Sequence, residues 1–145
     1  MSHERLSKVV KQLGWEYSLD AEGDYRIQVP LESGGTHTVG ISSHATILEG
    51  EFAVRDVWAV AARIPGELPD GLAENLMSDS WGTRSWGTWA LAGITSDGKR
   101  VLVRLGRIPV DAEKKMMASV LLETARTAYQ MQNALSAIDA SGEQE

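Results

Sequence analysis

The amino-acid sequence predicts an α+β fold, in which an antiparallel sheet of five to six strands carries N-terminal, middle and long C-terminal helices on one face. Two observations lead to this prediction. Runs of alternating apolar residues follow one another through short turns, which is typical of antiparallel strands. Helical periodicity occurs only at the beginning, in the middle and at the end of the chain. Helices grouped in this way pack as a layer on a sheet, and the expected order is α-β-β-β-(β)-α-β-β-α.

The first 65 residues predict one short helix followed by a meander of strands. Ser2 can cap the helix, and Gly14 follows it at the position where a left-handed conformation is favoured. Alternating apolar residues then predict three strands with glycine-containing turns between them, at 15–19, 25–31 and 36–43. The pattern leaves the strand boundaries between His44 and Ile64 open, and it favours strands at 45–48 and within 54–64.

The segment 85–138 organises the rest of the chain. Asp70 caps a short helix that ends before Gly82, and a hairpin with an Asp97-Gly98 turn follows. Its first strand, 86–94, is apolar on both faces, as in strands that are covered on both sides or lie in mid-sheet. The return strand, 101–105, alternates between valine or leucine and arginine. We interpret it as half-buried with a basic outer face.

One long helix closes the chain. Pro109 ends the last strand because proline has no N–H for the ladder, and Asp111 is a good N-cap. The helix then runs to Ile138 without glycine or proline, and its apolar positions follow a heptad: Met117, Leu121, Thr124, Ala128, Met131, Leu135 and Ile138. At about 42 Å it exceeds the roughly 38 Å diameter of a domain of this size, so its end should overhang. We therefore expect a homodimer interface formed by Met131, Leu135 and Ile138.

Length and composition indicate one domain, residues 1–138, with a disordered acidic tail at 139–145. No apolar run could span a membrane, and the N-terminus lacks the apolar core of a signal peptide. The absence of cysteine excludes disulfides and thiolate chemistry, and a bacterial cytoplasm fits best. The net charge of −6 argues against nucleic acid as a partner, because phosphate neutralisation needs clustered lysine and arginine.

The polar motifs predict no catalytic residue, no metal site and no cofactor. His37 and His44 are an odd number of residues apart, which would place them on opposite faces of one strand. Ser42 and Ser43 precede His44, but neighbouring strand residues point apart and no nucleophile-elbow pattern surrounds them. The glycine-rich segment 33–36 lacks the lysine and the following helix of a phosphate loop, and a hairpin turn explains it.

Two groups of residues are candidates for binding a partner. Arg100, Arg104 and Arg107 lie in a segment without acidic residues, which is either a solvated strand face or a docking strip for an acidic segment. Trp81 and Trp86 lie among glycines near Trp89. They could form an aromatic platform or a pocket for a peptide side chain, whereas the alternative is that they pack in the core and at its rim.

The segment 86–138 resembles the type III secretion chaperone-like superfamily, in particular its YbjN-type branch, described as bacterial sensory transduction regulators. The resemblance lies in Gly87-Thr88-Trp89-Ala90-Leu91, the Asp97-Gly98 turn, the strand 101–105, Ile108-Pro109-Val110, and the helix with Leu121, Leu122, Ala125 and Tyr129. It implies a small homodimer without catalysis that presents apolar grooves to a protein segment. The extra strand expected between His44 and Ile64 departs from the secretion chaperones and favours the regulator branch.

The leading hypothesis is therefore a non-enzymatic protein-binding module, chaperone-like or regulatory, that is a cytoplasmic homodimer. A small-ligand binder with a pocket at Trp81 and Trp86 is the alternative. An enzyme whose site is assembled from residues that sequence patterns do not connect is a third hypothesis.

Overall fold

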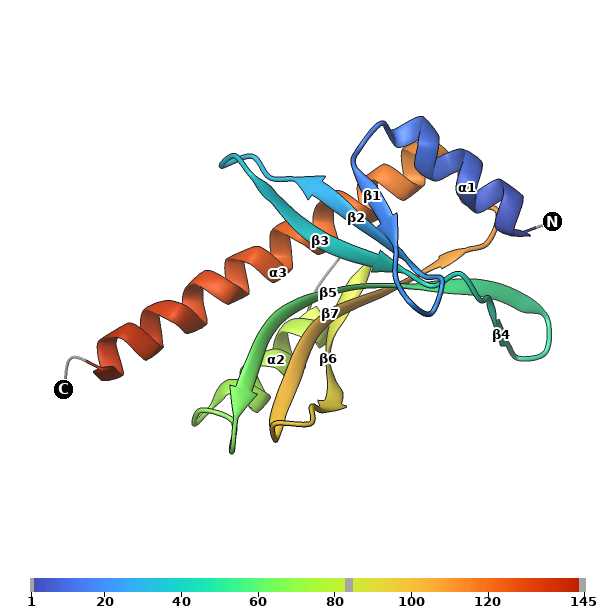
Figure 1. Ribbon diagram of the computed structural model, residues 1–145. Helices are drawn as coiled ribbons and strands as arrows, with labels where there is room; N and C mark the ends of the chain where they lie inside the picture. Colours follow the sequence, from blue (N-terminus) through green and yellow to red (C-terminus); the bar gives the residue numbers. More distant parts are fainter. Residues whose placement is uncertain (1, 83–84, 144–145) are drawn as a thin grey trace.

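The computed structural model describes residues 2–82 and 85–143, which form three helices and seven strands (Figure 1). The helices are α1 (Ser2–Leu13), α2 (Leu72–Gly82) and α3 (Lys114–Glu143). The strands are β1 (Tyr17–Leu19), β2 (Tyr25–Pro30), β3 (Thr36–Ile41), β4 (Thr46–Leu48), β5 (Phe52–Pro65), β6 (Gly87–Ile94) and β7 (Lys99–Pro109). This confirms the α+β class and the layout. The described strands number seven rather than five or six, because both of the strands that the pattern favoured in the open region form, as the short β4 and the 14-residue β5.

The strands form one antiparallel sheet in the order β1-β2-β3-β5-β7-β6, with β4 paired to the beginning of β5. The long central pair runs from Val54 opposite Pro109 to Pro65 opposite Lys99, with an irregularity after Val60. The apolar strand β6 lies at the edge of this sheet, where it pairs only with β7. Its composition had indicated a strand in mid-sheet or covered on both sides, so this expectation about its place in the sheet was wrong.

The core lies between one face of the sheet and the helices. Helix α3 crosses β2, β3, β5 and β7, α1 packs against α3, and α2 packs against β6 (Figure 1). Alternate strand residues point towards α3 and are fully buried, among them Ile27, Val39 and Val57. Burial of each such side chain stabilises the fold by about 1.5–3 kcal/mol. Of the helices described, none has an apolar stretch sufficient to span a lipid bilayer.

Helix α3 differs from its expected bounds at both ends. It begins at Lys114 rather than directly after Asp111, and the carbonyl of Glu113 accepts the N–H of Met117 at 2.9 Å. Asp111 instead provides its backbone oxygen to the guanidinium of Arg5, at 2.7 Å. The helix continues to Glu143, so residues 139–143, which we expected to be disordered, are helical. Its C-terminal end extends past the sheet in Figure 1, as its length had indicated.

Gly40 and Trp58 set the closest approach between β3 and β5. The two residues are directly opposite each other, and the indole of Trp58 lies over Gly40. A Cβ atom on Gly40 would come within 2.4 Å of the indole Cε2. The absence of a side chain at this position therefore allows the indole to lie flat on the outer face of the sheet, away from the helices.

Gly40→Ala is expected to lower the free energy of unfolding by about 1–3 kcal/mol, because the indole must move to make room for the methyl group. Urea unfolding measures the change. The matched control is Gly82→Ala, because no atom of the described residues lies within 4 Å of a Cβ built there. Replacing Trp58 by Leu in the Gly40→Ala background should recover part of the loss. Equal stability of the two alanine variants would contradict this account of the contact.

Candidate functional site

The side chain of Arg104 lies inside the protein, contrary to its expected place on an exposed basic face. It is 1% exposed, and it points towards the helices together with Leu102. Val103 and Leu105 lie on the opposite, outer face, where they are directly across from Val60 and Trp58. The face assignment of β7 was therefore inverted. Two carboxylates make burial of the arginine possible by supplying opposite charge.

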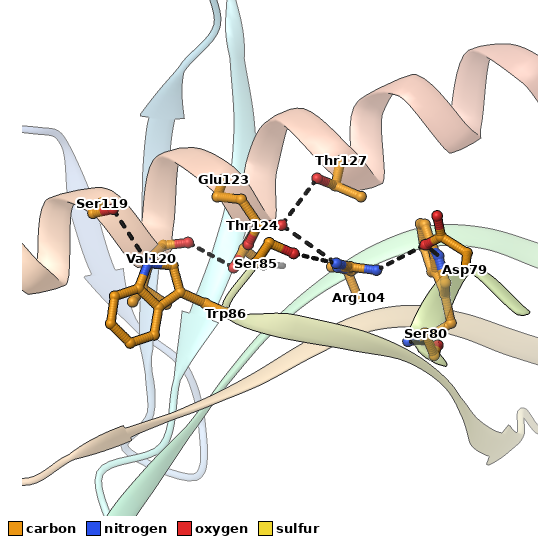
Figure 2. A network of polar contacts seen from close by, with 11 residues as sticks. Asp79, Ser80, Ser85, Trp86, Arg104, Ser119, Val120, Glu123, Thr124 and Thr127 are labelled. Carbon is orange, nitrogen blue, oxygen red and sulfur yellow. Dashed lines mark hydrogen bonds and ion pairs between the residues drawn. The ribbon is translucent and has the colours of Figure 1, made fainter. Parts of the chain in front are cut away.

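Arg104 connects α2, β7 and α3 (Figure 2). Its guanidinium lies 3.3 Å from Glu123 Oε1 on α3 and 3.4 Å from Asp79 Oδ2 on α2, and it donates to Ser85 Oγ at 2.9 Å. The guanidinium also stacks over the ring of Trp89, 5.1 Å from its centroid. A cation held by two acids and an aromatic face fixes the relative positions of these elements. The arrangement gives Arg104 a structural role and leaves it inaccessible to a partner.

The remaining members of the basic strip do not form a continuous charged surface. The guanidinium of Arg107 is half-exposed and pairs with Asp56, directly opposite on β5, at 3.1 Å. Lys99 lies 3.9 Å from Asp97 in the hairpin turn. Among the described residues, Arg100 is the member of this group that is exposed and has no acidic partner within salt-bridge distance. A docking strip for an acidic segment therefore lacks the density of free charge that it would need.

The tryptophans occupy different surroundings. Trp89 is half-buried against the core, and its indole N–H donates to Asp79 at 2.8 Å. Trp86 is partly exposed, and its indole N–H donates to Ser119 of α3 at 3.2 Å (Figure 2). It borders a cleft of about 560 Å³ together with Pro109, residues 111–113 and Met116. Trp81, in contrast, is 89% exposed at the end of α2. Such a side chain is available to a partner but forms no wall of a pocket with Trp86.

An apolar groove lies between α2 and β6. Its volume is about 520 Å³, and none of the described residues that line it is charged: Leu68, Ala73, Leu76, Met77, Ser80, Thr88, Trp89, Ala90, Leu91 and Leu102. Met77 is 75% exposed and Leu91 is 44% exposed at its rim. Large apolar side chains with this much exposure, gathered around a concave surface, mark a site of interaction. The sequence patterns did not predict an apolar groove between α2 and β6.

The free edge of β6 adjoins this groove. The backbone N–H of Trp89 points away from β7 and donates to Ser80 Oγ of α2 at 3.0 Å, so α2 covers the edge at this residue. Backbone groups alternate in direction along a strand, so those of Leu91 also point to the open side. Gly93, with φ at +118°, and the irregularity after Leu91 end the regular part of the strand. The accessible edge is therefore short and lies beside the groove.

Three acidic residues of the β1–β2 turn lie close together, with oxygen atoms of Asp20, Glu22 and Asp24 within 4.8 Å of one another. Asp20 accepts the backbone N–H groups of Glu22 and Asp24 and pairs with Arg26. Desolvation opposes ionisation, but these hydrogen bonds and the arginine outweigh it and lower the pKa of Asp20. Asp24 accepts both the N–H and the hydroxyl of Ser43. The hydrogen bonds and the ion pair of Asp20 and Asp24 within and next to the turn therefore explain why these acidic side chains lie close together.

Arg55 is a buried charge that sequence patterns did not indicate. Its guanidinium donates to the carbonyl oxygens of Ser42 and Ser43, at 3.0 and 2.6 Å, and burial lowers its pKa although Tyr25 opposes the shift. Within the described part of the chain, its Nε and Nη2 atoms have no hydrogen-bond partner. In the sequence, Arg55 lies between Val54 and Asp56, like an ordinary surface arginine. Its burial beside the carbonyls of Ser42 and Ser43 results from tertiary packing, which the local sequence does not indicate.

The expected dimer interface at the end of α3 is largely covered by its own chain. Leu135 is 9% exposed and belongs to the core, and the half-buried Met131 packs against that core. The side chain of Ile138 lies outside the described residues. The exposed positions from 130 to 136 are mostly polar. Leu135 is therefore a core residue, a member of the same buried cluster as Ile64 of β5 and Leu72 and Leu76 of α2.

No protein-family model matches this chain, and no curated protein is similar enough to it to count as a match.

Proposed function

We propose that this protein is a non-enzymatic protein-binding module, chaperone-like or regulatory, which acts in the cytoplasm and holds an extended apolar segment of a partner protein in the groove between α2 and β6. One observation carries the proposal: β6 has the composition of a central strand but lies at the edge of the sheet. Edge strands that remain free usually carry charged residues or proline, which discourage pairing with other chains. From Gly87 to Ile94, β6 has neither.

The groove and the strand edge together suit an extended peptide. A segment that passes along β6 beyond Trp89 can pair with backbone groups of Leu91, while its alternate side chains enter the uncharged groove. Met77 and Trp81, both strongly exposed on α2, would then cover the bound segment. Large flexible and aromatic side chains are the residue types that dominate binding energy at protein interfaces.

The resemblance to type III secretion chaperones and YbjN-type regulators supports the same class of function and adds a homodimer. Because Met131 and Leu135 near the end of α3 belong to or pack against the chain's own core, we assign the dimer contact to other exposed apolar residues rather than to the helix end. Sedimentation velocity at increasing concentration tests this part. A constant mass near 15.8 kDa, that of a single chain, would contradict a homodimer.

Site-specific photo-cross-linking in the producing cells tests the groove. A benzophenone amino acid in place of Met77 is expected to form an adduct with one defined protein, identified by mass spectrometry. A second substitution, Leu91→Asp, should suppress this adduct because a carboxylate at the rim would have to be desolvated against apolar atoms. Leu91 is partly exposed, so the variant should keep the circular dichroism spectrum of the wild type.

The control carries the same cross-linker at Leu122, which is 40% exposed on α3. The purified partner segment should then bind the wild type and bind the Leu91→Asp variant at least tenfold more weakly. Equal adducts at both positions, or equal affinity of the two proteins for the segment, would exclude the groove as the binding site.

A further inference from the structure

A polar crevice opens where β3 and β5 separate. The two strands pair at Gly40 with Trp58 and at Ile41 with Val57, and they diverge towards the beginning of β3 and the end of β5 (Figure 1). Beyond the Gly40 pair, a side chain rather than the backbone of β3 bonds to β5. The Nε2 atom of the His37 imidazole lies 2.9 Å from the carbonyl oxygen of Val60. The resulting crevice has a volume of about 470 Å³ and is lined by residues of β2, β3, β5 and α3.

His37 forms the inner wall of the crevice, where it contacts both β5 and α3. Because a carbonyl oxygen only accepts, Nε2 must carry the hydrogen in the bond to Val60, and Nδ1 is the remaining ring nitrogen. The imidazole also contacts the ring of Tyr129 on α3 edge to face, with the centroids 6.2 Å apart. A strand, a neighbouring strand and a helix thus fix one side chain, as is usual for the wall of a preformed binding site.

The lining of the crevice is mostly polar, and no acidic residue of the described chain contributes to it. It consists of Arg26, Thr36, His37, Thr38, Trp58, Val60, Arg63 and Gln132. This is unusual in a chain with 20 acidic and 14 basic residues. The charge of Arg26 is already shared between Asp20, at 3.0 Å, and the face of Trp58. The side chain of Arg63 is exposed and, in the part of the chain that is described, forms no hydrogen bond or ion pair, whereas its backbone pairs with Val101 of β7.

The hydrogen-bonding directions of the lining define the ligand further. The hydroxyls of Thr36 and Thr38 both donate to Gln28 Oε1, at 3.3 and 3.1 Å, so towards the crevice their oxygens can only accept. Arg63 and the amide of Gln132 supply donors for an anionic group. A ligand that satisfies both sets must combine a negative charge with a hydrogen-bond donor of its own.

We propose that this crevice binds a small hydroxy acid, with its carboxylate at Arg63 and its hydroxyl at Thr36 and Thr38. The volume lies within the range of about 300–1,000 Å³ that is usual for small-molecule sites. A divalent cation does not fit, because no carboxylate lines the crevice and two arginines do. The site is separate from the α2–β6 groove and shares no lining residue with it. The proposal is therefore separate from the protein-binding function proposed above, and neither rests on the other.

Titrations of the full chain with pairs of related acids test the proposal. The probes are lactate with propionate, malate with succinate, and citrate with tricarballylate, each pair differing by one hydroxyl. The readouts are isothermal titration calorimetry and the amide and indole resonances of Trp58 in nitrogen–proton correlation spectra. We expect at least one hydroxy acid to shift the Trp58 resonances and to bind at least tenfold more tightly than its partner without the hydroxyl.

Arg63→Ala is expected to weaken that binding at least tenfold without changing the thermal unfolding midpoint, because Arg63 is exposed. Arg100→Ala, which removes an equally exposed arginine outside the crevice, should leave the affinity unchanged. The proposal is overturned if none of the six acids shifts the Trp58 resonances at 10 mM (about the weakest affinity of interest, near 3 kcal/mol). It is also overturned if each pair binds equally, or if the two arginine variants lose affinity to the same extent.

Discussion

Arg104→Ala is expected to lower the free energy of unfolding by about 3–5 kcal/mol, because it leaves the carboxylate of Glu123 buried without its counter-charge. The ion pair with Glu123 is almost completely enclosed, with side-chain exposures of 2% for the arginine and 12% for the acid. Asp79 contributes much less. More than half of its side chain is exposed, and an exposed pair stabilises a fold by about 0–1 kcal/mol. Chemical denaturation followed by circular dichroism measures the effect.

A charge-free double variant distinguishes the loss of the ion pair from the loss of the volume that the arginine side chain fills. Arg104→Met with Glu123→Gln removes both charges and keeps most of the volume, so it should be more stable than Arg104→Ala alone. Arg107→Ala is the matched control, since it removes an exposed arginine of the same strand and should cost about 1 kcal/mol or less. If Arg104→Ala were as mild as Arg107→Ala, the guanidinium would not be the element that connects α2, β7 and α3.

Leu121→Ala is expected to destabilise the fold by about 2–5 kcal/mol, because the side chain is fully buried where α3 crosses the sheet. The adjacent Leu122 points to solvent, and Leu122→Ala should change the stability by less than about 1 kcal/mol. Urea unfolding of the two variants compares the buried and the exposed side of the same helical turn. Equal losses would contradict the orientation of α3.

The same comparison extends to the end of the helix. Leu135→Asp should unfold the domain rather than dissociate a dimer, since the structure places Leu135 in the core. A folded variant of unchanged melting temperature would restore the original interpretation of the helix end as an interface.

The elements that sequence patterns predicted well are those whose signals are local. Helix α1 spans Ser2–Leu13, close to the helix expected between a cap at Ser2 and Gly14, and Gly14 adopts the left-handed conformation that ends it. The Asp97-Gly98 turn joins β6 to β7 as expected, with Gly98 at φ +80°. Periodicity and turn chemistry depend on neighbours in sequence, so these elements do not require knowledge of the tertiary structure.

The errors concern which face of an element is buried. In β7, the valines and leucines at 101, 103 and 105 favoured one buried face, yet Arg104 and Leu102 face the helices. The arginine can be buried because Glu123, 19 residues later, and Asp79, 25 residues earlier, meet it there. No periodicity within β7 encodes these partners. The groove beside β6 escaped prediction for the same reason, since α2 and β6 meet only in the folded chain.

The position of α3 has a consequence for how the protein is made. All seven described strands precede Lys114 in the chain. Four of them, β2, β3, β5 and β7, pack against the helix that begins there. A nascent chain that has left the ribosome only as far as residue 113 therefore exposes the apolar face of its sheet to solvent. Stable folding must wait until the helix has emerged, and the unfinished chain is most vulnerable to aggregation in that interval. The four strands that pack against α3 are made early, but their buried face is covered only when this late helix docks.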